Sequence, residues 1–131
     1  MSPEASVLSR HRLVRAEAAC REGDLLANQA AFSGAVNRYY YAAFHAARAL
    51  LATRGVDSSR HAGVIALFQQ HFVKTGDFSS EVARALPRSF EKRLSSDHSD
   101  FVEISAGEVD RIRVDVHRFV SACRDHLARE P

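Results

Sequence analysis

Cysteine is scarce in this sequence, and so are other features that define whole classes of protein. Two cysteines, Cys20 and Cys123, occur in 131 residues, which excludes a disulfide framework, and their separation matches no metal-binding motif. We expect both to be buried free thiols in a reducing compartment. No apolar run approaches the length of a membrane span, and the N-terminal residues lack the apolar core of a signal peptide. These absences predict a cytoplasmic protein that does not act in a membrane.

Lysine is scarce as well, because only two lysines accompany sixteen arginines, and the formal net charge is +2. Arginine binds phosphate through a planar fork and is less costly to desolvate than lysine. An arginine-rich composition also follows from GC-rich coding, and the composition does not separate these two causes. The charge balance alone therefore does not indicate a nucleic-acid binder.

Strict alternation of apolar and polar residues, the pattern of a half-buried strand, is absent. The long segments show helical periodicity instead, and we predict an all-α, up-and-down bundle of about five helices with short loops. The length suits a single domain, residues 1–131, with its core at about 3–128. The expected helices cover about 3–28, 32–53, 60–74, 79 or 80 to 94, and 105 onward.

Three local signals concern the ends and the course of these helices. We expect residues 57–59, Asp-Ser-Ser, to cap the third helix. Pro87 lies inside the fourth helix and is expected to kink it. Ser105 and Glu108 have the spacing of a capping box and predict the start of the last helix.

The helix expected at residues 32–53 has two informative faces. One is a wide apolar stripe that predicts contact with several neighbours. The second carries Asn37, Tyr41, His45 and Arg48 at i, i+4, i+8 and i+11. An amide, a phenol, an imidazole and a guanidinium in one row indicate a buried polar network, an interface or a site, so we expect this face to be shielded from solvent. The apolar stripe consists of Val36, Tyr40, Ala43, Phe44, Ala47, Leu50 and Leu51.

Residues 37–51, Asn-Arg-x-Tyr-Tyr-Ala-x-Phe-His-Ala-x-Arg-Ala-Leu-Leu, resemble the second helix of HEPN-domain proteins. The resemblance continues through residues 59–64, 68–76 and 93–98 and covers about 5–128 in all. HEPN proteins are small, all-helical and usually dimeric prokaryotic proteins, often encoded beside a minimal nucleotidyltransferase. The resemblance therefore implies a homodimer that belongs to a pair of toxin–antitoxin type, with a minimal nucleotidyltransferase as its partner protein.

HEPN ribonucleases cut RNA without a metal and carry an arginine that is followed, after about four to six residues, by a histidine. Four pairs in this sequence have such a spacing, so spacing alone decides nothing. Arg93 and His98 are the pair that lies where the family has its motif, shortly before the final helix. The resemblance thus makes Arg93 and His98 the candidate catalytic residues of a metal-independent endoribonuclease.

These residue types suit that chemistry. An imidazole near neutral pH accepts the proton of a ribose 2′-hydroxyl, a second imidazole protonates the leaving oxygen, and a guanidinium neutralises the phosphate. One His98 per chain supplies half of this, so a twofold dimer would bring two copies of Arg93 and His98 into one cleft. Asp97 is expected to orient one of these groups. Asn37, Arg38, Tyr41 and His45 are expected to support the site.

Other interpretations stay open. Arg93 and Asp97, at i and i+4, also suit a surface ion pair of little energetic value. Many relatives have Arg-x3-Asp-Tyr in this register, so His98 is alternatively a substitution for tyrosine in a nuclease-dead branch. The protein would then be a non-catalytic module that binds a nucleotide or a partner, or a structural helical dimer.

The remaining histidines rank lower as catalysts. We interpret His61 as a first-turn residue satisfied by the helix cap, and His45 as part of a buried network or of the dimer seam. Four others show no constellation and are expected at the solvent or at a rim: His11, His71, His117 and His126. No zinc ligand set, P-loop or glycine-rich phosphate cradle occurs, so we expect neither a metal nor a cofactor.

Overall fold

The computed structural model describes residues 1–98 and 103–130, and for Asp97 and His98 it describes the backbone alone. These residues form six α-helices and one π-helical turn, without a strand, as the all-α prediction expects. In chain order the elements are α1 (Pro3–Asn28), α2 (Phe32–Thr53), α3 (His61–Phe68), η1 (Gln69–Val73), α4 (Ser80–Ala83), α5 (Ala85–His98) and α6 (Ala106–Arg129). Because α4 is a single turn, five longer helices build the molecule.

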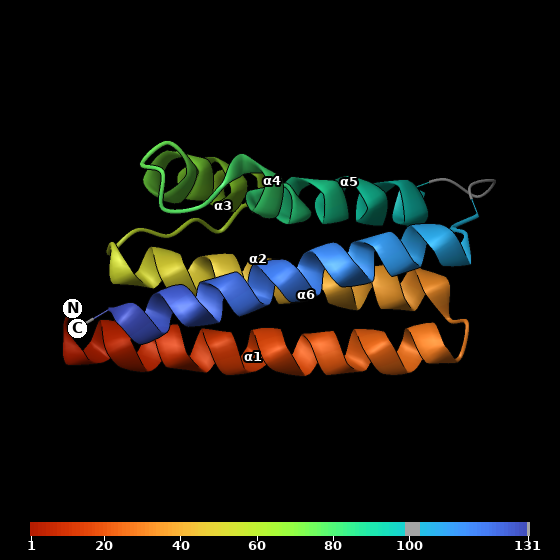
Figure 1. Ribbon diagram of the computed structural model, residues 1–131, viewed down its shortest axis with the longest axis horizontal. Coiled ribbons are helices and arrows are strands. Elements are labelled where there is room, and N and C mark those ends of the chain that lie inside the picture. The colour runs from red at the N-terminus through yellow and green to blue at the C-terminus, as the bar shows by residue number, and fades with distance from the viewer. Residues whose placement is uncertain (99–102, 131) are drawn as a thin grey trace.

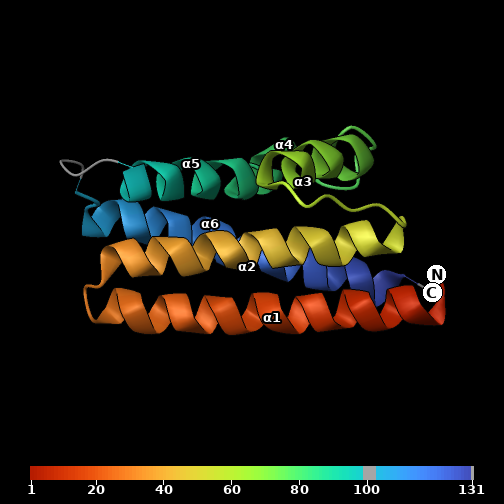
Figure 2. The ribbon, with the colours of Figure 1, turned by 180° about the vertical axis from the view of Figure 1, so that it is seen from behind.

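The helices lie in three layers. Figure 1 shows α1 along one side, α2 and α6 in the middle, and α3, α4 and α5 along the other side. Figure 2, from behind, shows α2 in front of α6. Helix α2 contacts α1, α3, α5 and α6, and 14 of its 22 residues are buried. It is therefore the central element, and its many alanines let the neighbouring helices approach closely.

The first two helices begin and end where the sequence predicts. The Ser2 hydroxyl accepts a hydrogen bond from the Ala5 N–H and caps α1, with Pro3 in the first turn. After α2 the chain turns at Gly55, whose φ of +69° lies in the left-handed region that glycine tolerates. The expected apolar stripe of α2 is buried along its whole length.

The third helix does not begin with the expected cap. Arg60 is the residue before α3, and no side chain caps this end. Asp57 instead accepts hydrogen bonds from Arg48 at 2.8 and 3.0 Å and from Arg12 at 2.9 Å. These partners lie on α1 and α2. The Asp57 carboxylate, which the local sequence predicts as a helix cap, therefore forms ion pairs with two other helices instead. The helix then continues from Phe68 into η1 rather than remaining α-helical to residue 74.

The expected fourth helix is in fact two helices. Helix α4 ends at Ala83 and α5 begins at Ala85, so the prediction of one kinked helix is wrong. Pro87 lies in the first turn of α5, where the missing N–H is not needed for an intrahelical hydrogen bond. Proline thus permits a new helix start here and does not bend a continuous one.

Helix α6 begins at the predicted cap. The Ser105 hydroxyl accepts a hydrogen bond from the Glu108 N–H at 3.2 Å, and the Glu108 carboxylate accepts one from Lys92 of α5 at 2.5 Å. Its apolar stripe packs into the core with Cys123, and Cys20 is buried on α1, which confirms both thiols as free and buried. Among the described residues, no helix is long and apolar enough to cross a membrane.

Candidate functional site

Arg93 is held by three groups of α2. Its Nε donates a hydrogen bond to Oδ1 of Asn37 at 3.1 Å. Its guanidinium carbon lies 5.4 Å from the ring centre of Tyr40 and 5.2 Å from that of Tyr41. Such distances allow the cation to interact with the negative faces of both rings. The arginine that the sequence singled out is therefore a positioned, partly buried group, and not merely one half of a surface ion pair.

The polar face of α2 extends this environment away from Arg93. The Arg38 guanidinium lies 5.8 Å from the Tyr41 ring centre, so Tyr41 contacts two arginines. The His45 ring follows 6.0 Å beyond Tyr41, and Arg48 is fixed by Asp57. None of Asn37, Tyr41, His45 and Arg48 is exposed, which confirms that this face is shielded.

Two nitrogens on this face are buried without a hydrogen-bond partner among the described residues. They are Nε of Arg38 and Nδ1 of His45. Burial, and then the positive charges of Arg15, Arg48 and other arginines, lower the pKa of His45 to about 4. His45 is therefore neutral at pH 7, and one of its nitrogens lacks the partner that a buried polar group ordinarily has.

His61 also lies near Arg93, and the sequence did not predict this proximity. Its Nδ1 forms a 2.5 Å hydrogen bond with the Tyr40 hydroxyl, and its ring is stacked on Phe90 with centres 5.7 Å apart. His61 does lie in the first turn of α3, but a tyrosine of α2 satisfies it and the helix cap does not. Its membership of the family-like segment 59–64 was the one signal in the sequence.

The backbone of α5 reaches Asp97 and His98, but their side chains lie outside the described residues. Arg93 of the predicted catalytic pair is thus placed beside Asn37 and Tyr41, and Tyr41 in turn contacts Arg38. The roles of Asp97 and His98 stay predictions.

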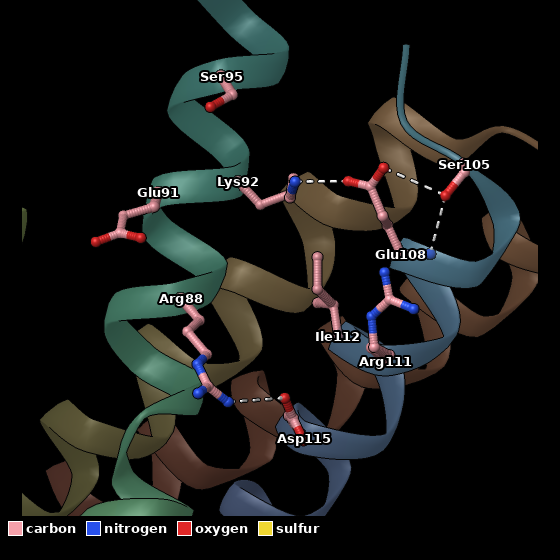
Figure 3. Close-up of a pocket in the computed structure, with 9 residues that line it drawn as sticks. All are labelled: Arg88, Glu91, Lys92, Ser95, Ser105, Glu108, Arg111, Ile112 and Asp115. Carbon is pink, nitrogen blue, oxygen red and sulfur yellow. Dashed lines mark hydrogen bonds and ion pairs between the residues drawn. The ribbon is translucent and has the colours of Figure 1, made fainter. Parts of the chain in front are cut away.

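A groove between α5 and α6 lies on another side of α5, with a volume of about 730 Å³. Figure 3 shows Lys92 and Arg88 of α5 directed toward Glu108 and Asp115 of α6, with Arg111 between the two pairs. Lys92 pairs with Glu108, and Arg88 lies 3.9 Å from Asp115. Two of the three cations that line the groove are thus paired with carboxylates of α6. Lys92 faces α6, whereas its neighbour Arg93 faces α2.

Two histidines that were expected at the solvent or at a rim, His117 and His126, take part in contacts between segments of the chain. His117 of α6 hydrogen-bonds Asp24 at 2.9 Å, and Asp24 also accepts from the Tyr39 hydroxyl. His126 lies 3.3 Å from Glu130 and packs against Phe72 and Phe78. Both sets of contacts join secondary-structure elements and lie apart from Arg93. Among the described residues, no three acidic, histidine or cysteine side chains gather where a metal ion could bind.

The arrangement around Arg93 has the parts that a phosphodiester requires. It combines an oriented guanidinium, an imidazole and the partly exposed ring of Tyr41, on which a base can stack. Burial, and then the charge of Arg93, lower the pKa of His61 below its ordinary value, so that this imidazole is neutral at pH 7. Burial raises the pKa of the Tyr40 hydroxyl, which keeps its proton.

Comparison with known proteins assigns the chain to one family. The sequence model of the HEPN domain matches residues 9–126. A UPF0332 protein of Thermotoga maritima is 38% identical over 95 residues, which are 72% of each chain. A protein named "Putative toxin MJ0142", from Methanocaldococcus jannaschii, is 26% identical over 113 residues, 86% of this chain and 77% of its own. A UPF0332 protein of Gloeobacter violaceus is 36% identical over 98 residues, 75% of each chain.

Proposed function

The chain belongs to the HEPN domain family, and we propose that it is a metal-independent endoribonuclease of a toxin–antitoxin or nucleotidyltransferase-associated pair. Arg93 and His98 carry the reaction across the cleft of a homodimer. The similarity to a protein named as a toxin supports membership of such a pair. A minimal nucleotidyltransferase is the proposed partner protein, and single-stranded RNA is the proposed substrate.

The observation that carries this proposal is the fixed position of Arg93. An arginine that only closes a helix end needs no specific partner, whereas this one is oriented by an amide and two aromatic rings of another helix. Fixing the direction of a guanidinium before substrate binds lowers the cost of neutralising a phosphate in the transition state. The neighbouring Tyr41 ring is only partly buried and suits the sequence-tolerant stacking of an unpaired base.

The polar face of α2 is the proposed seam of the homodimer. Tyr41 on this face contacts both Arg38 and Arg93, and its side chain is only partly buried in the single chain. A second copy on this face would bring a second Arg93 and His98 close to the first.

The test is an RNA-cleavage assay in the presence of a chelator, with the wild type and His98→Ala. The wild type is expected to cleave single-stranded RNA and to leave 2′,3′-cyclic phosphate and 5′-hydroxyl ends, because the 2′-hydroxyl is the nucleophile. His98→Ala is expected to be slower by at least about 100-fold. If the wild type binds RNA or a nucleotide but cleaves none, the protein is instead a non-catalytic binding module and the nuclease proposal is wrong.

A further inference from the structure

His61 is placed by three helices at the side of Arg93. It is the first residue of α3, its Nδ1 is bonded to Tyr40 of α2, and its ring is stacked on Phe90 of α5. Phe44 of α2 closes another side, with ring centres 4.9 Å apart. The imidazole is therefore fixed in orientation, and among the described residues its hydrogen bond uses Nδ1 and not Nε2.

Arg93 and His61 share the Tyr40 ring as a neighbour. The Arg93 guanidinium carbon and the His61 ring centre each lie 5.4 Å from the centre of this ring. Both groups are thus within about one nanometre of each other, the separation that two groups on either side of one phosphate require. The charged and titratable groups that face His61 are Arg93 from α5, and Tyr40 and Tyr41 from α2.

We propose that His61 is the general base of the RNA-cleaving site, so that the two proton transfers fall to two different histidines, His61 and His98. This inference rests on the proposed function. The role requires the tautomer in which Nδ1–H of His61 donates to the Tyr40 oxygen, so that Nε2 is left to accept a proton. Tyr40 is then a positioning residue, because it fixes the tautomer and direction of the imidazole.

The reaction balances with these groups alone. Nε2 of His61 takes the proton of the ribose 2′-hydroxyl while the 2′-oxygen forms a bond to phosphorus. The bond from phosphorus to the 5′-oxygen breaks, and the second imidazole gives its proton to that oxygen. The products are a 2′,3′-cyclic phosphate and a 5′-hydroxyl. Arg93 compensates the negative charge on the phosphoryl oxygens during the transfer.

The arrangement also explains how one base remains ready at neutral pH. The apolar rings around His61 and the charge of Arg93 disfavour the imidazolium form, so the resting group carries a lone pair. Once substrate brings a phosphate to Arg93, the charge of that arginine is compensated and the imidazolium that forms is better tolerated. The burial of His61 and the charge of Arg93 thus both favour an imidazole that is neutral before substrate binds.

Two matched variants separate catalysis from structure. His61→Asn keeps a polar atom near the position of Nδ1 but has no Nε2, whereas Tyr40→Phe removes the hydrogen bond and keeps the whole imidazole. His11→Asn, an exposed histidine on α1, is the control. Cleavage of a random-sequence single-stranded RNA pool is measured in chelator across pH 5 to 8. Binding is measured with the 2′-deoxy pool, which lacks the attacking hydroxyl, and melting temperatures report folding.

We expect His61→Asn to cleave RNA at least about 100-fold more slowly than wild type. Its affinity for the 2′-deoxy pool should stay within about threefold of wild type. The unfolded fraction of the variant at the assay temperature should be no larger than that of the wild type. Tyr40→Phe is expected to be about 10-fold slower, because the imidazole is present but less well oriented. The acid limb of the wild-type pH profile, below about pH 6.5, should vanish from the residual activity of His61→Asn. His11→Asn should behave as wild type.

The outcomes separate the two proposals. A wild type that cleaves, together with a folded His61→Asn that cleaves within about threefold of it or keeps the acid limb, overturns the role of His61 alone. A wild type that cleaves no RNA overturns the proposed function and this inference with it. Equal losses of cleavage and of 2′-deoxy binding in His61→Asn would make His61 a structural residue and overturn its role as base.

Discussion

His45 couples the folding of this molecule to pH. Its side chain is 6% exposed on α2, and burial and nearby arginines lower its pKa to about 4. In the unfolded chain the imidazole titrates near its ordinary pKa of about 6.5. Between these two values the unfolded state binds the proton that the folded state excludes, so stability rises with pH through this window and is lost as pH falls.

We predict that His45 lowers the free energy of unfolding by about 2 kcal/mol when pH falls from 7 to 5. Glutamine at position 45 cannot titrate. The free energy of unfolding of His45→Gln should therefore fall by about 2 kcal/mol less than that of the wild type over the same pH interval. Urea unfolding of both proteins at the two pH values measures the difference. The other histidines, His61 included, are common to both proteins and cancel in the comparison. An equal pH dependence in wild type and variant would show that His45 is not buried as a neutral group.

The residues around Arg93 show what sequence reveals about a site. Asn37, Arg38 and Tyr41 were predicted as supporting residues from their resemblance to the family, and they do lie beside Arg93 or its ring partners. His61 was placed at its own helix cap instead, because its partner Tyr40 is 21 residues away in sequence. Local sequence patterns predict hydrogen bonds between residues that are close in the chain. The hydrogen bond between His61 and Tyr40 depends instead on how three helices pack.

The same distinction separates the helices that sequence predicts well from those that it does not. The bounds of α1 and α2, and the cap at Ser105, follow from residues within a few positions of each end. The start of α3 at His61 lies within one residue of the prediction, but its cap was predicted wrongly because Asp57 pairs with Arg12 and Arg48 of two other helices. The division between α4 and α5 was missed because proline was interpreted as a kink, although it is equally compatible with a first turn.

Gly23 decides how closely α1 approaches α2. A Cβ at this position would lie 2.7 Å from the Tyr39 ring, which the hydrogen bond from its hydroxyl to Asp24 holds in place. We predict that Gly23→Ala lowers the free energy of unfolding by about 1–2 kcal/mol, because overpacking outweighs the gain in helix propensity. Denaturant unfolding followed by circular dichroism measures this.

Gly107→Ala is the matched control for this prediction. Gly107 is also helical, but a Cβ there would meet nothing nearer than 3.8 Å. This variant should be unchanged or more stable by about 0.5 kcal/mol, since alanine favours a helix. If Gly23→Ala were stabilised to the same extent, the contact between α1 and the Tyr39 ring would be looser than described.

At the scale of the whole molecule, the central helix has one face that the described chain does not fully satisfy. Helix α2 is covered by α1, α3, α5 and α6, yet Arg38 and His45 keep buried nitrogens without partners among the described residues. Arg93 borders the same face through Tyr41. A second copy of the chain on this face would bring two arginine–histidine pairs together.

We predict that the protein is a homodimer at tens of micromolar, with twice the 14.5 kDa mass of one chain by light scattering. Tyr41→Glu should produce a monomer, because it puts a charge on the shared face. Val14→Arg should remain dimeric, although Val14 is 58% exposed and apolar, because it lies on the outer face of α1. A monomeric wild type would remove the shared cleft, and a dimer broken by Val14→Arg alone would move the seam to α1.

The central claim is that Arg93, oriented by Asn37, acts on the phosphate of RNA. The most direct test is the rate of RNA cleavage in chelator by wild type, Arg93→Ala, Asn37→Ala and Asn28→Ala. Asn28 is the matched control, because it accepts a 3.2 Å hydrogen bond from Arg113 away from the site. We predict losses of at least about 100-fold for Arg93→Ala and about 10- to 100-fold for Asn37→Ala, and none for Asn28→Ala. Cleavage that persists in both Arg93→Ala and Asn37→Ala, or that is absent from the wild type, would contradict the claim.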